Sequence, residues 1–115
     1  MPYNEFLGDR IRAILIEKRV NFFEKNMFGG LCFMVDDKMC IGVVRDEVMA
    51  RIGVDAYEDA LKKPGCKEMN FTGRPMKGYV FLIDDATDME SDLAYWIQLA
   101  LDFNPLARAS KKRKK

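Results

Sequence analysis

Apolar residues recur at helical spacing in two long segments of the chain, one near each end. From Asn4 to about Lys18 they fall on one helical face, and Asn4 is placed to cap the N-terminus. From Glu90 to Phe103 a second apolar stripe recurs, and Pro105 ends it. Both segments are predicted to be helices with one buried face, formed by Leu7, Ile11, Ile14 and Leu15 and by Leu93, Trp96, Ile97, Ala100 and Leu101.

A shorter helix is predicted between these two. It begins at Asp55, where Glu58 completes a capping box, and it stops before Pro64. Short strand-like runs surround it, three before and two after, at 31–35, 39–44, 47–52, 66–71 and 77–83. Residues 20–26 are expected to be irregular. The order predicts a two-layer α+β domain, α-β(3)-α-β(2)-α, with an antiparallel five-stranded sheet and helices on one side.

The short connections "DD" and "RD" predict which strand residues share a face. As two-residue hairpin turns they place Val35 opposite Lys38 and Val44 opposite Glu47. Because side chains alternate along a strand, one face is wholly apolar and is expected under the helices; it carries Cys32, Met34, Met39, Ile41, Val43, Val48, Ala50 and Ile52. The other face is mixed and is expected to be partly covered or to meet a partner; it carries Leu31, Phe33, Val35, Lys38, Cys40, Val44, Glu47, Met49 and Arg51.

Composition narrows the chemistry. The 115 residues include 49% hydrophobic and 32% charged residues, as in a soluble globular domain. The longest apolar run is too short to cross a bilayer and the N-terminus has no signal-peptide pattern, so a cytoplasmic location is expected. The chain contains no histidine, which removes the usual general base and most zinc sites. We expect no metal and no cofactor, and we expect the three cysteines to be free thiols, with Cys32 and Cys40 on opposite faces of the sheet.

The net charge of +1 hides an asymmetry along the chain. Residues 1–107 are predicted to form the domain and 108–115 a flexible basic tail. Without the six basic residues of the tail, the body has thirteen Lys and Arg against eighteen Asp and Glu. The tail has two interpretations: weak, salt-sensitive contact with nucleic acid phosphates, or a solubilising end. The candidate nucleic-acid residues are Lys111, Lys112, Arg113, Lys114 and Lys115.

Two glycine-containing motifs invite a functional interpretation. Gly29 and Gly30 resemble a phosphate-binding loop in composition, but they open a strand rather than a helix, so we interpret them as a structural bend. In "GRPM", Gly73 and Pro75 are predicted to shape a turn. Arg74 either contacts a partner's carboxylate or phosphate, or reaches back to an acid of this chain.

A family resemblance rests on "MFGGLCFMVDDKMCIGVV", on "FTGRPMKGYVFL" and on "W" and "AL" in the last predicted helix. Together these motifs, from about Met27 to Phe103, resemble the TfoX/Sxy family and its N-terminal domain, which also occurs as a free-standing protein. The resemblance implies a fold like that of type III secretion chaperones. It also implies kinship with bacterial regulators of competence genes, thought to act as transcription coactivators. Those regulators carry a second, helical domain, which we expect to be absent from this chain.

The function expected from the sequence is that of a non-enzymatic regulatory or protein-interaction module. The hypothetical partner-contact residues lie on the mixed sheet face and at the "GRPM" turn: Phe33, Met49, Arg51, Arg74, Met76 and Lys77. A homodimer through the mixed face is a further hypothesis. The alternatives are an enzyme that binds a small ligand or modifies nucleic acid, with its site around the "GRPM" turn, and a chaperone-like escort suggested by the fold alone.

Overall fold

The computed structural model of the chain describes residues 3–27, 29–69 and 77–106. The expected α+β class is confirmed. The elements in chain order are α1 (Glu5–Glu17), β1 (Phe23–Met27), β2 (Gly30–Val35), β3 (Lys38–Val44), β4 (Glu47–Arg51), α2 (Val54–Leu61), β5 (Cys66–Glu68), β6 (Tyr79–Leu82), α3 (Asp84–Thr87), α4 (Glu90–Phe103) and the short 3-10 helix η1 (Asn104–Leu106).

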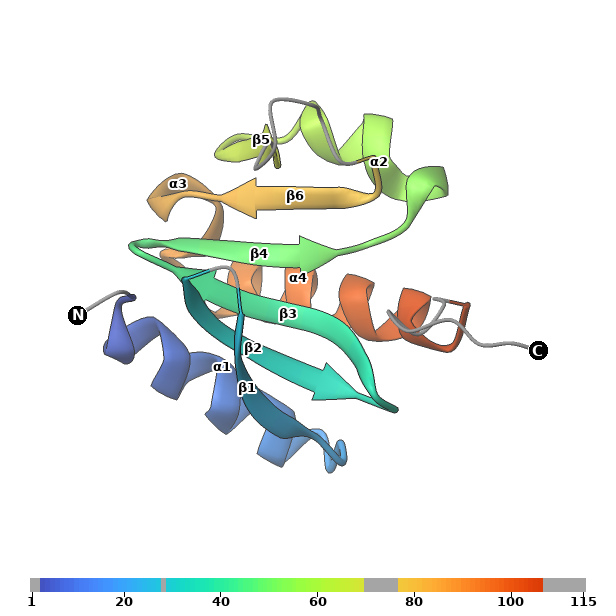
Figure 1. Cartoon of the computed structure of the whole chain (residues 1–115). Coiled ribbons are helices and arrows are strands. Elements are labelled where there is room, and N and C mark those ends of the chain that lie inside the picture. Colours follow the sequence, from blue (N-terminus) through green and yellow to red (C-terminus); the bar gives the residue numbers. More distant parts are fainter. Residues whose placement is uncertain (1–2, 28, 70–76, 107–115) are drawn as a thin grey trace.

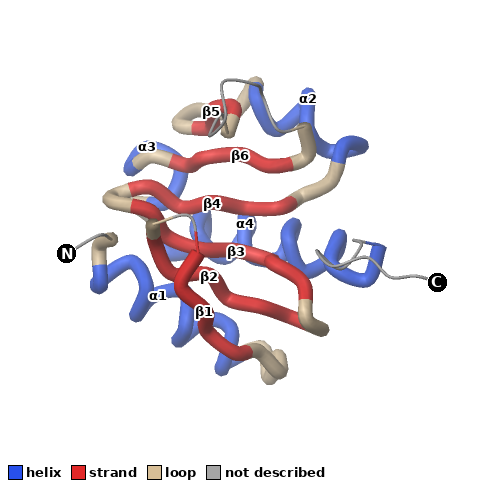
Figure 2. Tube along the Cα trace, viewed as in Figure 1, coloured by secondary structure: helices blue, strands red, loops and turns tan. Residues whose placement is uncertain are grey.

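The strands form one antiparallel sheet in the order β1-β2-β3-β4-β6-β5. Helices α1 and α4 lie behind this sheet in the view of Figure 1 and cover one of its faces. Figure 2 shows the strands as one curved layer, with α2 at the edge formed by β5 and β6. We call the covered side the helix face and the opposite side the outer face.

The sheet has six strands rather than the predicted five. The additional strand, β1, lies in a segment that we expected to be irregular, and it pairs with β2 at the edge of the sheet. Its side chains from Phe23 to Asn26 are exposed, so no apolar alternation marks it in the sequence. Arg12 of α1 holds it through Glu24, with the Arg12 Nη2 atom 3.1 Å from the Glu24 Oε1 atom.

The glycine pair occupies the connection between β1 and β2. Met27 pairs with Gly30, and Gly29 has a φ of +75°, a conformation that favours glycine. A Cβ atom at Gly30 would collide with the carbonyl oxygen of Val43 in β3. The structural role expected for Gly29 and Gly30 therefore has a direct cause in backbone conformation and close packing.

The N-terminal ends of the helices agree with the capping signals in the sequence at α1 but not at α2. Asn4 caps α1 as predicted: its side-chain oxygen accepts hydrogen bonds from the backbone N–H groups of Phe6 and Leu7. The capping box predicted at Asp55 does not form, because α2 begins one residue earlier and follows Gly53, which provides no side-chain cap. Helix α3 was not predicted, since four residues are too few to show a helical period.

Both predicted hairpin turns are confirmed. Val35 lies opposite Lys38, and Val44 lies opposite Glu47, so the turns between β2, β3 and β4 have two residues each. Asp36 and Asp37 in the first turn are exposed, and both adopt positive φ angles, as such a turn requires.

An extra residue in β3 decides which side chains share a face. Phe33 pairs with Ile41, whereas Met34 pairs with Met39, so Cys40 has no counterpart in β2 and forms a β-bulge. The prediction assumed strict alternation through this hairpin. It was therefore wrong for all of β2 and for the first residues of β3, whose side chains lie on the faces opposite to those predicted.

The corrected faces are both apolar. The helix face carries Leu31, Phe33, Ile41, Val43, Val48, Ala50, Val80 and Leu82, with Val35 and Cys40 packed beside Ala100 of α4. The outer face carries Cys32, Met34, Met39, Met49 and Met69, with Val44, Tyr79 and Phe81 partly buried against them. Cys32 and Cys40 do lie on opposite faces, but each on the side predicted for the other, and all three thiols are free.

Candidate functional site at the seam between α2 and α4

Two predicted contact residues are buried. Phe33 lies on the helix face rather than the outer face, and its side chain is fully buried with its ring centroid 5.7 Å from that of Phe22. Met49 does lie on the outer face, but it is also fully buried, in the cluster with Met69. Neither side chain has a surface to offer a partner, so the predicted contacts at Phe33 and Met49 are incompatible with the structure.

The other predicted contact residues have different outcomes. Arg51 is half-buried, with its guanidinium carbon 5.3 Å from the ring centroid of Tyr79 and 5.9 Å from that of Phe103. Lys77 is exposed in a turn. Contacts through Arg51 and Lys77 stay predictions, as do the roles of several residues that lie outside the described ranges: Gly73, Arg74, Pro75, Met76, Lys111, Lys112, Arg113, Lys114 and Lys115.

Two surface hollows lie where α2 and α4 are beside each other, and a further one of about 230 Å³ lies at the β2–β3 turn beside Phe22 and Met34. One pocket joins the residues just after α2 to the start of α4, and another joins the start of α2 to the end of α4. The two pockets thus lie at opposite ends of one seam, which we call the α2–α4 seam. No motif in the sequence indicates this seam, because its walls come from segments that are far apart in the chain.

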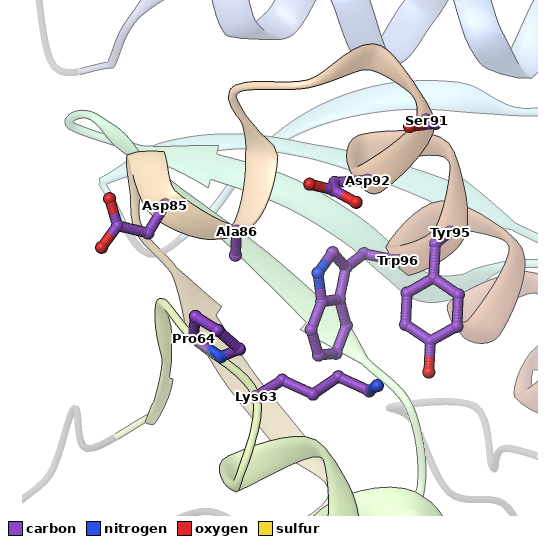
Figure 3. Close-up of a pocket in the computed structure, with 8 residues that line it drawn as sticks. All are labelled: Lys63, Pro64, Asp85, Ala86, Ser91, Asp92, Tyr95 and Trp96. Carbon is purple, nitrogen blue, oxygen red and sulfur yellow. The ribbon is translucent and has the colours of Figure 1, made fainter.

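The larger pocket, which we call the tryptophan pocket, has a volume of about 430 Å³ (Figure 3). Its walls are Lys63, Pro64, Asp85, Ala86, Ser91, Asp92, Tyr95 and Trp96. Trp96 is only 3% exposed, and the nitrogen of its indole ring is on the edge that faces Ala86 and Asp92 in Figure 3. Its N–H group donates no hydrogen bond within the described ranges, so a donor points into the pocket without an acceptor.

Charged groups stand around this pocket. The Lys63 ammonium lies 5.2 Å from the ring centroid of Tyr95, a cation–π geometry. Figure 3 shows that Asp92 projects from α4 toward the side of the pocket where Ala86 lies, whereas the Asp85 carboxylate points from α3 away from Trp96. Both are exposed, and neither carboxylate makes an ion pair or a hydrogen bond with a described residue.

The smaller pocket, which we call the leucine pocket, has a volume of about 210 Å³. It is lined by Ile52, Val54, Asp55, Ala56, Leu99, Asp102, Phe103 and Leu106. Val54 and Leu106 are 64% and 75% exposed, which is high for large apolar side chains. Asp102 accepts a hydrogen bond of 2.8 Å from the Gln98 side chain, and Asp55 is exposed. Like the tryptophan pocket, this one combines apolar walls with two aspartates.

The elements that form the seam are strongly acidic. Helices α2, α3 and α4 contain three, two and three Asp or Glu residues, and no Lys or Arg. Acids in the first turn of a helix stabilise it, which accounts for Asp55, Asp85 and Asp92 without any ligand. Asp102 differs, because it lies near the C-terminal end of α4, where the helix dipole disfavours negative charge and no basic residue compensates.

The cysteines contribute little to surface chemistry. Burial raises the pKa of the Cys32 thiol to about 11, that of Cys40 to about 12 and that of Cys66 to about 11. These thiols are therefore protonated near neutral pH, and a protonated thiol is a poor nucleophile.

Among the described residues, no group of three or more His, Cys, Asp or Glu is arranged to hold a metal ion. No helix in these ranges is long and apolar enough to span a membrane.

Comparison with known protein families identifies the fold. The family description "TfoX N-terminal domain" matches residues 15–104, which is most of the chain. The chain belongs to the TfoX N-terminal domain family. The matched range contains the whole sheet, α2, α3 and α4, and therefore every residue of the tryptophan pocket. No curated protein and no solved structure matches the chain.

Proposed function

We propose that this member of the TfoX N-terminal domain family is a non-enzymatic module that binds another protein and acts in regulation. The α2–α4 seam is the proposed binding surface. One observation carries this proposal: two apolar pockets with exposed rims lie at the ends of a single seam on the acidic side of the domain. Exposed apolar side chains clustered with such hollows are typical of protein interaction sites.

A regulatory role is supported by the family. The two-domain TfoX/Sxy proteins that the sequence resembles are regulators of competence genes, and a coactivator works by contacting other proteins. The raised pKa values of the three thiols argue against a cysteine nucleophile. The sequence contains no histidine to serve as a general base. We therefore propose that this chain is a binding component rather than a catalyst. We also propose that it acts in the cytoplasm.

The proposal is tested by site-specific crosslinking in the cells that produce the protein. A photo-reactive phenylalanine analogue replaces Tyr95, which is 45% exposed at the rim of the tryptophan pocket. The matched control carries the same analogue at Phe6, which is 70% exposed on α1 and outside the seam. We expect a discrete protein adduct from position 95 and none from position 6.

The adduct also tests the regulatory part of the proposal. Mass spectrometry identifies the crosslinked protein, and a component of the transcription machinery is the result expected for a coactivator. An adduct with a protein of another process would contradict the regulatory role but not the interaction surface. Identical adducts from both positions, or none from position 95, would contradict the surface itself.

A further inference from the structure

We propose that the α2–α4 seam binds an extended, basic peptide segment of a partner protein, with one arginine or lysine side chain in each of its two pockets. This inference rests on the proposed function, because it names the chemistry of the partner at the same surface.

The charge of the seam selects a cationic ligand. The described residues contain twelve Lys and Arg against eighteen Asp and Glu, and eight of these acids lie on α2, α3 and α4. Each pocket contributes two carboxylates beside apolar walls, Asp85 and Asp92 in one and Asp55 and Asp102 in the other. A long basic side chain matches this arrangement, because its methylene groups pack on apolar surface while its charged end meets the carboxylates.

Aromatic walls strengthen that selection in the tryptophan pocket. The chain itself already places a cation on one of them, since the Lys63 ammonium lies over the Tyr95 ring. Lys63 is exposed, so its side chain is able to move aside when a ligand enters. A guanidinium group also stacks on aromatic rings and binds carboxylates with two parallel hydrogen bonds, which favours arginine over lysine at this position.

The unpaired Trp96 N–H group indicates that the ligand is a peptide rather than an isolated cation. Trp96 is buried as a residue, but its N–H group is open to solvent at the pocket wall and has no acceptor among the described residues, so a ligand carbonyl oxygen is able to replace water there. A peptide backbone supplies that carbonyl next to the basic side chain. The pocket volume of about 430 Å³ lies within the range of roughly 300–1,000 Å³ that is usual for ligand sites.

The spacing of the pockets sets the spacing of the cations. Asp92 and Asp102 are ten positions apart on α4, which corresponds to about 15 Å at a rise of about 1.5 Å per residue. Four residues of an extended peptide cover about 13 Å at about 3.3 Å per residue, and side chains four positions apart project from the same side of the peptide. Asp102 accepts a hydrogen bond from Gln98 one turn earlier on α4, and its carboxylate keeps further acceptor capacity for a cation at the second pocket.

The test uses the single tryptophan of the full-length chain, which produces one indole N–H signal in a nitrogen-15 NMR spectrum. The probe is a blocked alanine peptide with two arginines four positions apart, so that both side chains project from the same side of the extended chain. We expect the indole signal to shift and to saturate during titration. The matched peptide with citrulline, an uncharged analogue of arginine, should not shift it, and the peptide with adjacent arginines should bind several-fold more weakly.

Protein variants locate the binding. Asp92→Asn and Asp102→Asn should each weaken binding several-fold. Asp37→Asn removes the same charge from the exposed β2–β3 turn and should leave binding unchanged. Trp96→Phe keeps an aromatic ring but removes the N–H donor, and it should weaken binding when followed by peptide fluorescence. Equal losses in the Asp37 and Asp92 variants would overturn the proposal, because they would indicate unspecific charge attraction.

The remaining outcomes separate this inference from the proposed function. An indole signal unmoved by millimolar peptide, combined with a crosslinked protein at position 95, would mean that the surface binds a partner of different chemistry. Absence of both would overturn the surface as well. A third outcome is an indole signal that shifts when salt is added but not when peptide is added. It would mean that the chain's own basic end fills the pocket, and it would contradict the proposed partner.

Discussion

The two faces of the sheet are both buried, yet they are made of different residues. The helix face is built from leucine, isoleucine, valine and phenylalanine and packs against the regular surfaces of α1 and α4. The outer face is built from four methionines and Cys32, with two aromatic residues of β6 beside them. Stiff, branched side chains suit a regular partner surface, whereas the flexible methionine side chain fills irregular gaps.

This difference shows that burial alone does not say what covers a surface. The buried side chains of the clusters on the two faces are 0–9% exposed, so exposure alone does not distinguish them. Residue type does distinguish them, because only the helix face is packed like a regular core. We therefore predict that substitutions on the helix face lower the free energy of unfolding strongly. Substitutions on the outer face that change the shape of a side chain but keep its volume should lower it less.

Exchanging the two faces should have the largest effect. Deleting Gly42 would restore strict alternation across the hairpin and turn Ile41 from the helix face to the outer face. We expect this variant to lose cooperative unfolding, a loss above about 4–5 kcal/mol. Deleting Cys40, the bulged residue itself, keeps Phe33 opposite Ile41 and should cost much less. Urea denaturation followed by circular dichroism compares the two; similar losses would show that the bulge does not sort the faces.

A single large truncation on the helix face should come next. Phe33→Ala removes a fully buried ring and should lower the free energy of unfolding by about 3–5 kcal/mol. Met49→Leu on the outer face keeps the volume and should cost less than about 1.5 kcal/mol. Urea unfolding at neutral pH measures both. A loss at Met49 as large as that at Phe33 would contradict the difference between the faces.

A smaller effect on the free energy of unfolding is expected from pH, because each face of the sheet contains one buried thiol. Burial raises the pKa of Cys32 to about 11 and that of Cys40 to about 12, whereas an unfolded cysteine has a pKa of about 8.5. Above that pH the unfolded chain loses these protons first, so the native state binds more protons and stability falls as pH rises. The stabilisation is complete below about pH 8 and is lost progressively between about pH 9 and 12.

The measurement is the urea midpoint at about pH 8 and about pH 10.5, compared among single alanine variants. Cys32→Ala and Cys40→Ala should each reduce the alkaline loss by a similar amount, because about pH 10.5 lies above the unfolded pKa and below both raised pKa values. Lysine and tyrosine titrate in the same range, so the difference between each variant and the unchanged chain is the informative quantity. An alkaline loss unchanged by either variant would assign it to those other groups.

The sequence predicts the elements of this fold well where a period or a turn is long enough to recognise. Helices α1 and α4 and both hairpin turns were predicted because their signals are local. The bulge was not, since Cys40 is one apolar residue within an apolar strand and nothing in the sequence distinguishes it from its neighbours. That one residue misplaced Phe33 and, with it, a predicted contact site.

The candidate site was harder to predict than the fold. Lys63, Asp85 and Trp96 meet only after α2, α3 and α4 have packed, and no sequence spacing connects them. Trp96 was correctly expected in the core. The direction of its N–H group, toward a pocket, depends on how α4 packs and could not be predicted from the sequence. The available signal was Asp102, an acid near the C-terminal end of a helix, where negative charge is unfavourable.

The polar character of β1 has a consequence for the protein in concentrated solution. An edge strand exposes unpaired backbone groups that recruit strands from other molecules, and charged side chains along the strand discourage this. Glu24 and Lys25 are such charges, and the pairing of Glu24 with Arg12 keeps the strand docked on its own domain. A more hydrophobic β1 would be easy to recognise in the sequence, and it would turn this edge into a nucleus for aggregation.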